Sequence, residues 1–301
     1  MENNATNKAY DIRSKAYEIT LVIRRKTFTK KDKAVSERVA VRNGTNARRA
    51  GNFNKRLFAK KHLAKINSIA TEIGNYYREK TLPWGIGGSR ILPTALFFEF
   101  RAWIIKKEAE FYEAVNEFIA NYPLAVAEAK AELNGLFNPA DYEDPAKLRD
   151  SFRIEFEHRP IADTSDFRLA LSDIAVERLK NELESDYSKK LDKAMAEIWT
   201  RLSESVKDMR DKLDEYSKDH DVNGENASKK FMTAWARNVR NVAKAIPSLN
   251  LTDDPRLEEL RVEVEELLES NPDDALKTSV DSRKKAIKKA DDILGKMGAF
   301  A

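Results

Sequence analysis

Basic residues interleaved with aromatic rings dominate the first 65 positions of the chain and form its strongest chemical signal. Lys and Arg neutralise backbone phosphates, and exposed rings stack on the bases of single strands. Neither contact needs a fixed motif, so the pattern predicts sequence-independent binding of a nucleic acid. The candidate contact residues are Arg24, Arg25, Lys26, Lys30, Lys31, Arg48, Arg49, Lys55, Arg56, Lys60 and Lys61, with Phe28 and Phe53 between them.

The formal net charge of +4 conceals a strong separation of charge along the chain. Residues 1–65 contain 18 Lys and Arg against 5 Asp and Glu, a net charge of +13, so the remainder carries −9. Such separation is typical of proteins that contact nucleic acid or another anionic surface. The alternative is a solvated arm whose charge serves solubility or docks on the acidic remainder.

A glycine-rich segment, residues 85–90, is a second candidate anion site. Its backbone amides could form a nest for a phosphate, with Arg90 as a clamp. The segment lacks the Lys-Ser/Thr pair of a nucleotide P-loop and does not match the dinucleotide fingerprint. A hinge between two helices, residues 81–93 with an exposed Trp84, is the favoured interpretation.

Histidines and carboxylates give little support for catalysis. His62, His158 and His220 have no metal-binding spacing, and the chain contains no cysteine. One small cluster, His158 with Asp163 and Asp166, could form a metal or general-base site. We therefore expect a protein that is not an enzyme and needs no catalytic residue, metal or cofactor.

A long helix is expected to organise the fold. Apolar residues recur at steps of three or four from Val176 to Tyr216, with a mean step of about 3.6 residues, and no Pro or Gly interrupts them. This period favours packing against the chain's own helices, or an oligomer interface with little supercoil, over a long two-stranded coiled coil.

Shorter elements surround the long helix. Helices are expected over residues 54–80, with Asn54 as the N-cap, and over residues 94–122, before Pro123. Alternating patterns in Tyr17–Arg24 and Phe152–Glu157 predict two strands that pair, while residues 35–41 fit either a hairpin strand or a helical turn.

The predicted fold is mainly α-helical, a long-helix bundle with a small antiparallel β-sheet near the N-terminus. Residues 1–220 would form a basic N-terminal region plus the long-helix core, and residues 221–301 a C-terminal helical set. No apolar run approaches the roughly 18 residues of a membrane span, and no secretory signal is present, so we expect a cytoplasmic protein without membrane contact.

Five segments resemble an uncharacterised domain family of tailed-phage and prophage proteins, over about residues 15 to 265. The resemblance implies a phage origin, a bacterial host cell and a gene neighbourhood that often includes a MoxR-type ATPase and a von Willebrand A-type partner. It implies no established activity and no site residues. The segments are Leu82–Pro93, Glu110–Pro123, Leu136–Phe152, Ser165–Leu171 and Leu249–Arg261.

These features lead to one functional expectation and one alternative. We expect a sequence-independent nucleic-acid-binding protein of phage DNA replication or recombination, which favours single-stranded DNA and forms a homo-oligomer. The alternative is a non-enzymatic adaptor or assembly protein whose long helix and acidic helices engage an AAA+ ATPase or another protein partner.

Overall fold

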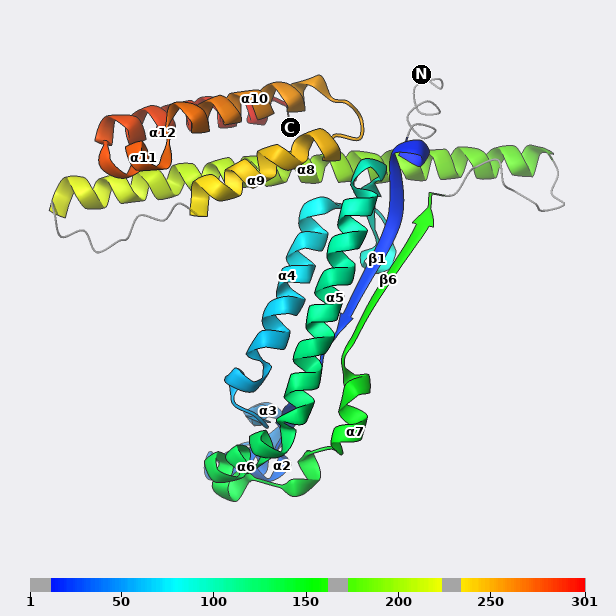
Figure 1. The fold of residues 1–301 in the computed structure, drawn as a ribbon, viewed down its shortest axis with the longest axis vertical. Helices are drawn as coiled ribbons and strands as arrows, with labels where there is room; N and C mark the ends of the chain where they lie inside the picture. The colour runs from blue at the N-terminus through cyan, green and yellow to red at the C-terminus, as the bar shows by residue number, and fades with distance from the viewer. Residues whose placement is uncertain (1–11, 162–172, 224–233, 301) are drawn as a thin grey trace. The chain divides into compact units, whose positions relative to one another are not determined.

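The computed structural model describes residues 12–161, 173–223 and 234–300. These residues are mainly helical with a small antiparallel sheet near the N-terminus, which confirms the predicted fold class (Figure 1). The predicted domain boundary at residue 220 lies close to residues 224–233, outside the described part, and stays a prediction.

Contacts within the chain define two compact units, which are described separately. Unit 1 draws on Met1–Thr20, Arg78–Phe98 and Glu157–Ala301. Unit 2 consists of Leu21–Tyr77 and Glu99–Phe156.

The long helix of unit 1, α8 (Asp173–Asn223), spans the whole segment predicted from the apolar stripe. The stripe is buried from Tyr187 to Tyr216, and Leu202 and Val206 are both 0% exposed. A helix this long buries its apolar stripe only against neighbouring elements. The spacing of the apolar residues therefore predicted both the helix and the face that packs.

Three further helices of unit 1 form a bundle together with α8. They are α9 (Ala234–Leu249), α10 (Pro255–Ser270) and α12 (Val280–Phe300), with the short α11 (Asp273–Thr278) between the last two. Helix α8 contacts α9 and α12, and α10 contacts both of these (Figure 1). The stripe thus packs against the chain's own helices, as its period indicates.

A four-stranded sheet contains both strands predicted from alternation. These are β1 (Ala16–Arg24) and β6 (Arg153–Pro160), and they are neighbours in the strand order β4-β5-β1-β6. The remaining strands, β4 (Leu82–Pro83) and β5 (Arg90–Pro93), form an antiparallel hairpin whose β5 pairs with β1. The predicted pairing of the two alternating segments is confirmed.

The β4–β5 hairpin corrects the expected hinge over residues 81–93. Gly87 and Gly88 have φ of 75° and 86°, the left-handed region that glycine adopts without strain, so the chain turns back on itself there. Trp84, expected to be exposed, is 6% exposed, and its ring centroid lies 6.0 Å from that of Tyr187 on α8. Pairing with β1 brings this apolar segment into the core, which its glycines and prolines conceal in the sequence.

The two helices predicted over residues 54–80 and 94–122 are present, but both begin later than expected. Helix α4 (Ala64–Lys80) begins ten residues after Asn54, so Asn54 is not its N-cap. Helix α5 (Phe97–Ala120) ends just before α6 (Tyr122–Leu133), as the proline at position 123 predicts.

Helices α4 and α5 pack together in unit 2, where the rings of Tyr76 and Trp103 stack with centroids 3.8 Å apart.

An aromatic cluster forms part of the core of unit 2. Phe28, only 4% exposed, has its ring centroid 5.2 Å from that of Phe58 and 5.4 Å from that of Phe118. Its φ of 49° is unusual for a bulky residue, and this packing holds the strained backbone in place. The cluster contains Phe28, Phe58, Phe118, Tyr122, Tyr142 and Phe152.

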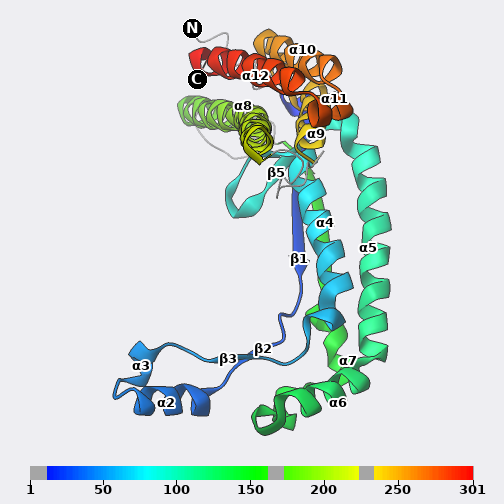
Figure 2. The ribbon, with the colours of Figure 1, turned by 90° about the vertical axis from the view of Figure 1, so that its left-hand side faces the viewer.

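Next to this cluster in unit 2, residues 29–56 form a two-stranded ribbon with two helices, which we call the basic arm. Strands β2 (Thr29–Lys31) and β3 (Asn54–Arg56) pair antiparallel, and α2 (Lys33–Arg42) and α3 (Ala47–Ala50) lie between them in the sequence (Figure 2). Residues 35–41, whose sequence fitted either a hairpin strand or a helical turn, are therefore helical. The Asp32 side chain caps this helix by accepting a hydrogen bond from the Val35 N–H at 3.0 Å.

Candidate nucleic-acid interface

The basic arm concentrates positive charge. It contains nine Lys and Arg against two acidic residues, Asp32 and Glu37, a net charge of +7. Asp32 is occupied as the cap of α2, and the hydrogen bond from Val35 is the main cause that lowers the pKa of its carboxyl. The arm therefore presents a strongly cationic surface at neutral pH.

The ribbon of the arm has two chemically different faces. Thr29 is paired with Arg56, and Lys31 with Asn54, so these four side chains share one face. All four are exposed, and none carries a carboxylate. The opposite face holds the remaining pair of the ladder, Lys30 and Lys55.

Lys55 is a structural residue, although its position in the sequence suggested phosphate binding. It is only 6% exposed, and its Nζ lies 2.8 Å from a carboxylate oxygen of Asp141 and donates to the Leu136 carbonyl at 2.7 Å. Its cross-strand neighbour Lys30 is exposed and has no ion pair within the described residues. The interface proposed below therefore omits Lys55.

Helix α2 adds two arginines that the sequence did not single out. Arg38 and Arg42 are four positions apart, so they lie on one face of the helix, opposite the buried Ser36 and Ala40. Both are exposed, and neither makes a hydrogen bond or ion pair within the described residues. Their spacing of four residues could have identified them from the sequence, but it places them on one face only if residues 33–42 are helical.

Most of the predicted contact residues are exposed in unit 2. Their side chains make no hydrogen bond or ion pair to the rest of the described chain, so their charges remain available to an anionic partner. They are Arg24, Lys30, Lys31, Arg48, Arg49, Arg56 and Lys60.

Three other predicted residues of unit 2 already have partners. The Arg25 guanidinium donates to the Asn67 side-chain oxygen at 3.1 Å, and Lys26 forms an ion pair with Glu143. Lys61 lies 2.7 Å from Glu128, and this hydrogen bond raises the pKa of Lys61 and lowers that of the Glu128 carboxyl. These residues contribute to the surface potential, but a phosphate would have to compete with their present contacts.

The two predicted aromatic residues have different positions. Phe28 is buried in the aromatic cluster and cannot stack on a base. Phe53 lies between α3 and β3, directly before the strand, and at 38% exposure its ring is accessible. Val39 and Val41 of α2 are exposed as well, at 44% and 80%, so apolar contact area accompanies the arginines.

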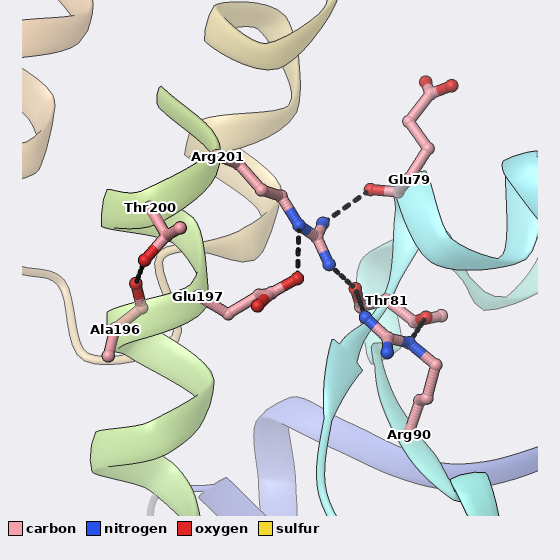
Figure 3. Close-up of polar contacts among 7 residues, drawn as sticks. All are labelled: Glu79, Thr81, Arg90, Ala196, Glu197, Thr200 and Arg201. Carbon is pink, nitrogen blue, oxygen red and sulfur yellow. Dashed lines mark hydrogen bonds and ion pairs between the residues drawn. The ribbon is translucent and has the colours of Figure 1, made fainter. Parts of the chain in front are cut away.

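Arg90 belongs to unit 1 and is held by internal contacts. Its Nε donates to the Thr81 hydroxyl at 2.6 Å and its Nη2 to the Thr81 carbonyl at 2.9 Å (Figure 3). Arg201 of α8 donates to the same carbonyl at 2.9 Å and forms an ion pair with Glu197 at 3.1 Å. The Arg90 guanidinium, a candidate phosphate clamp from the sequence, thus donates to the backbone oxygen of the buried Thr81.

The candidate catalytic cluster is only partly described. His158 is exposed on β6, with its ring 5.2 Å from Phe97 and 6.5 Å from Tyr17. Asp163 and Asp166 lie outside the described residues. Within the described ranges, no three His, Asp or Glu side chains are grouped so that they could hold a metal ion.

Fold and surface together define a mainly α-helical protein with a cationic β-ribbon arm. No model of a known protein family matches the chain, and the comparisons found no similar curated protein and no similar solved structure. Among the described helices, none combines the length and apolar character required to cross a membrane.

Proposed function

We propose that this protein binds nucleic acid without sequence specificity, favours single-stranded DNA, and uses the basic arm as its contact surface. The observation that carries the proposal is the set of exposed cations on the arm that form no hydrogen bond or ion pair through their side chains with the described residues, chiefly Arg38, Arg42, Arg48 and Arg49. Cations that have no internal partner neutralise phosphates without first breaking an ion pair. The proposal includes no catalytic step, metal or cofactor.

Single-stranded DNA is favoured over a duplex because the arm combines charge with accessible apolar groups. Phe53 can stack on an unpaired base, a contact worth about 1–3 kcal/mol that duplex DNA does not offer. The exposed Val39 and Val41 would pack against sugars or bases. A role in phage DNA replication or recombination, self-association and a cytoplasmic site of action in a bacterial host belong to the same proposal.

A binding assay with labelled oligo-dT and a duplex of equal length tests this proposal. The variant Arg38→Gln/Arg42→Gln should weaken binding of oligo-dT, while the matched control Lys189→Gln/Lys193→Gln should not. The control pair is also exposed, four positions apart on a helix, and without an ion pair in the described chain. Absence of binding to either DNA at low salt would contradict the proposal.

A groove in unit 1 favours a second candidate function, an adaptor that engages a protein partner. The groove has a volume of about 940 Å³ and runs along α8 from Asp192 to Asp211, bordered by α12 and the start of α10. Trp199, Leu294 and Met297 supply apolar surface within a rim of both acidic and basic side chains. Grooves of this kind accept the apolar face of a partner helix.

The resemblance to phage proteins makes a MoxR-type ATPase the first partner to test. Co-purification of the ATPase with the native chain, lost on Trp199→Glu but kept on Lys106→Glu, would support the adaptor function. Lys106 is exposed on α5 and lies outside the groove. Equal recovery with both variants would contradict a role for the groove.

A further inference from the structure

A pocket of about 440 Å³ lies at the base of the basic arm, inside unit 2. It is formed where the ribbon meets the turn that precedes α4, and it is lined by Thr27, Thr29, Arg56, Phe58, Lys60, Leu63, Ala64 and Asn67. None of the described residues that line this pocket carries a carboxylate. In a chain in which 35% of residues are charged, a pocket with cations and without acids selects for an anion.

The two cations of the pocket have no counterion among the residues that the structure describes. Arg56 and Lys60 are exposed, and neither forms an ion pair with the described residues. Nearby lysines differ, because Lys61 lies 2.7 Å from Glu128 and Lys65 lies 2.6 Å from Glu117. Carboxylates thus neutralise the lysines just outside the pocket, whereas no carboxylate of the described chain neutralises Arg56 or Lys60.

Hydroxyl and amide groups complete the polar wall. The Thr27 and Thr29 hydroxyl oxygens are 3.0 Å apart, and Thr29 is the cross-strand partner of Arg56. Asn67 is held in place because its side-chain oxygen accepts a hydrogen bond from Arg25. Hydroxyls and a guanidinium side by side are groups that hydrogen-bond phosphate oxygens.

The floor of the pocket is rigid and apolar. Phe58 is 6% exposed and packs edge-on against Phe118, Tyr122 and Tyr142, with ring centroids 5.4 to 5.7 Å apart. A pocket with such a floor and a cationic wall matches a nucleotide, which combines a charged phosphate with the apolar face of its base.

We propose that this pocket binds one phosphate group of a nucleotide, with Arg56 and Lys60 as the charge partners and Thr29 as a hydroxyl donor. The inference deepens the proposed function and rests on it for the source of the phosphate, which is either an internal diester of a strand or a terminal monoester. The pocket would fix the register of a strand whose neighbouring phosphates contact the rest of the arm.

Four probes separate these sources: inorganic phosphate, dTMP, and oligo-dT with either a 5′-hydroxyl or a 5′-phosphate. Calorimetry measures the first two, and fluorescence anisotropy measures the oligonucleotides. Arg56→Gln and Lys60→Gln should each weaken binding of at least one probe about tenfold, the loss expected for one charge-assisted contact. The control Lys106→Gln, an exposed lysine of unit 2, should bind as the native chain does.

The outcomes distinguish the pocket from the arm. A preference for the 5′-phosphate that both pocket variants lose identifies a terminal phosphate, and equal weakening with both oligonucleotides identifies a diester. If both pocket variants bind every probe as the native chain does, or if the native chain binds none, the inference is wrong. DNA binding that depends on Arg38 and Arg42 but not on Arg56 and Lys60 would leave the proposed function standing without the pocket. Binding of dTMP that depends on Arg56 and Lys60, without any binding of oligonucleotides, would support the pocket and contradict the proposed function.

Discussion

Thr29 and Arg56 are directly paired residues of β2 and β3, so a hydroxyl and a guanidinium stand side by side on the exposed face of the ribbon. The pairing has a chemical consequence, because the face it defines holds cations and neutral polar groups and no carboxylate. The opposite face holds Lys55, which is buried against Asp141. One ribbon thus separates a structural lysine from the cations that we propose bind phosphate.

The buried ion pair of Lys55 should be important for stability. Lys55→Met leaves the Asp141 carboxylate, whose side chain is 9% exposed, without its partner, and should reduce the free energy of unfolding by about 3 kcal/mol. Lys30→Met, at the cross-strand position, should change it by less than about 0.5 kcal/mol because Lys30 is exposed. Urea unfolding followed by circular dichroism measures both. Equal effects of the two substitutions would show that Lys55 is not held as described.

Arg201 should stabilise the junction between α4 and β4. Arg201→Ala removes donors from the carbonyls of Glu79 and Thr81, but the Thr81 carbonyl keeps its hydrogen bond from Arg90, so we expect a loss of about 0.5–1.5 kcal/mol (Figure 3). Lys193→Ala, an exposed position on the same helix, serves as the control. Thermal melting of the two variants gives the comparison, and an unchanged melting temperature for Arg201→Ala would argue against the contact.

Substitutions in the centre of the buried stripe of α8 should destabilise the fold, whereas substitutions on the exposed face of the helix should not. Leu202 is 0% exposed, so Leu202→Ala should cost about 2–5 kcal/mol through lost burial and a residual cavity. Lys189→Ala, on the exposed face, should be close to neutral. A similar small effect for both variants, measured by urea unfolding, would mean that α8 does not pack along this stripe.

Acid should destabilise unit 2 through carboxylates whose pKa is lowered in the folded state. The N–H of Val35 lowers the pKa of Asp32 below its ordinary value of 3.8, and Lys61 lowers that of Glu128 below 4.5. A lowered folded pKa gives stabilisation that is complete above the ordinary value and is lost as the pH falls through the folded value. The melting temperature should therefore decrease as the pH is lowered below about 4.5.

Asp32→Asn isolates one contribution to this acid sensitivity. Asn retains the N-cap hydrogen bond but does not titrate, so helix α2 should keep its cap at low pH. The variant should lose less helical signal than the native chain between pH 4 and pH 2 in circular dichroism. An identical acid profile would show that the Asp32 carboxylate does not contribute.

Sequence patterns predicted the elements whose local period is strong. The stripe from Val176 to Tyr216 anticipated α8 and its packing face, and alternation anticipated β1 and β6. These succeed because burial of one face imposes a period of 3.6 or 2 directly on the sequence. Pro123 likewise marked the end of α5, since proline is unfavourable in a helix interior and suits the first turn of a new helix.

The predictions that were wrong concern residues whose positions depend on partners distant in the sequence. Trp84 is buried because β5 pairs with β1, and the glycines around it gave no sign of that pairing. Asn54 resembles a helix cap, but pairing with Lys31 places it in β3. Of the candidate site, the exposed cations were within reach of sequence reasoning, whereas the burial of Lys55 by Asp141 was not.

The salt dependence of single-stranded DNA binding tests the central claim most directly. We predict that the logarithm of the oligo-dT association constant falls linearly with the logarithm of salt concentration. Each phosphate contact contributes a slope of about 0.7, so Arg38→Gln/Arg42→Gln should flatten the slope by about 1.4. The control Lys189→Gln/Lys193→Gln should retain the native slope. Absence of binding at low salt, or a slope that the arm variant leaves unchanged, would contradict the assignment of the basic arm as the nucleic-acid interface.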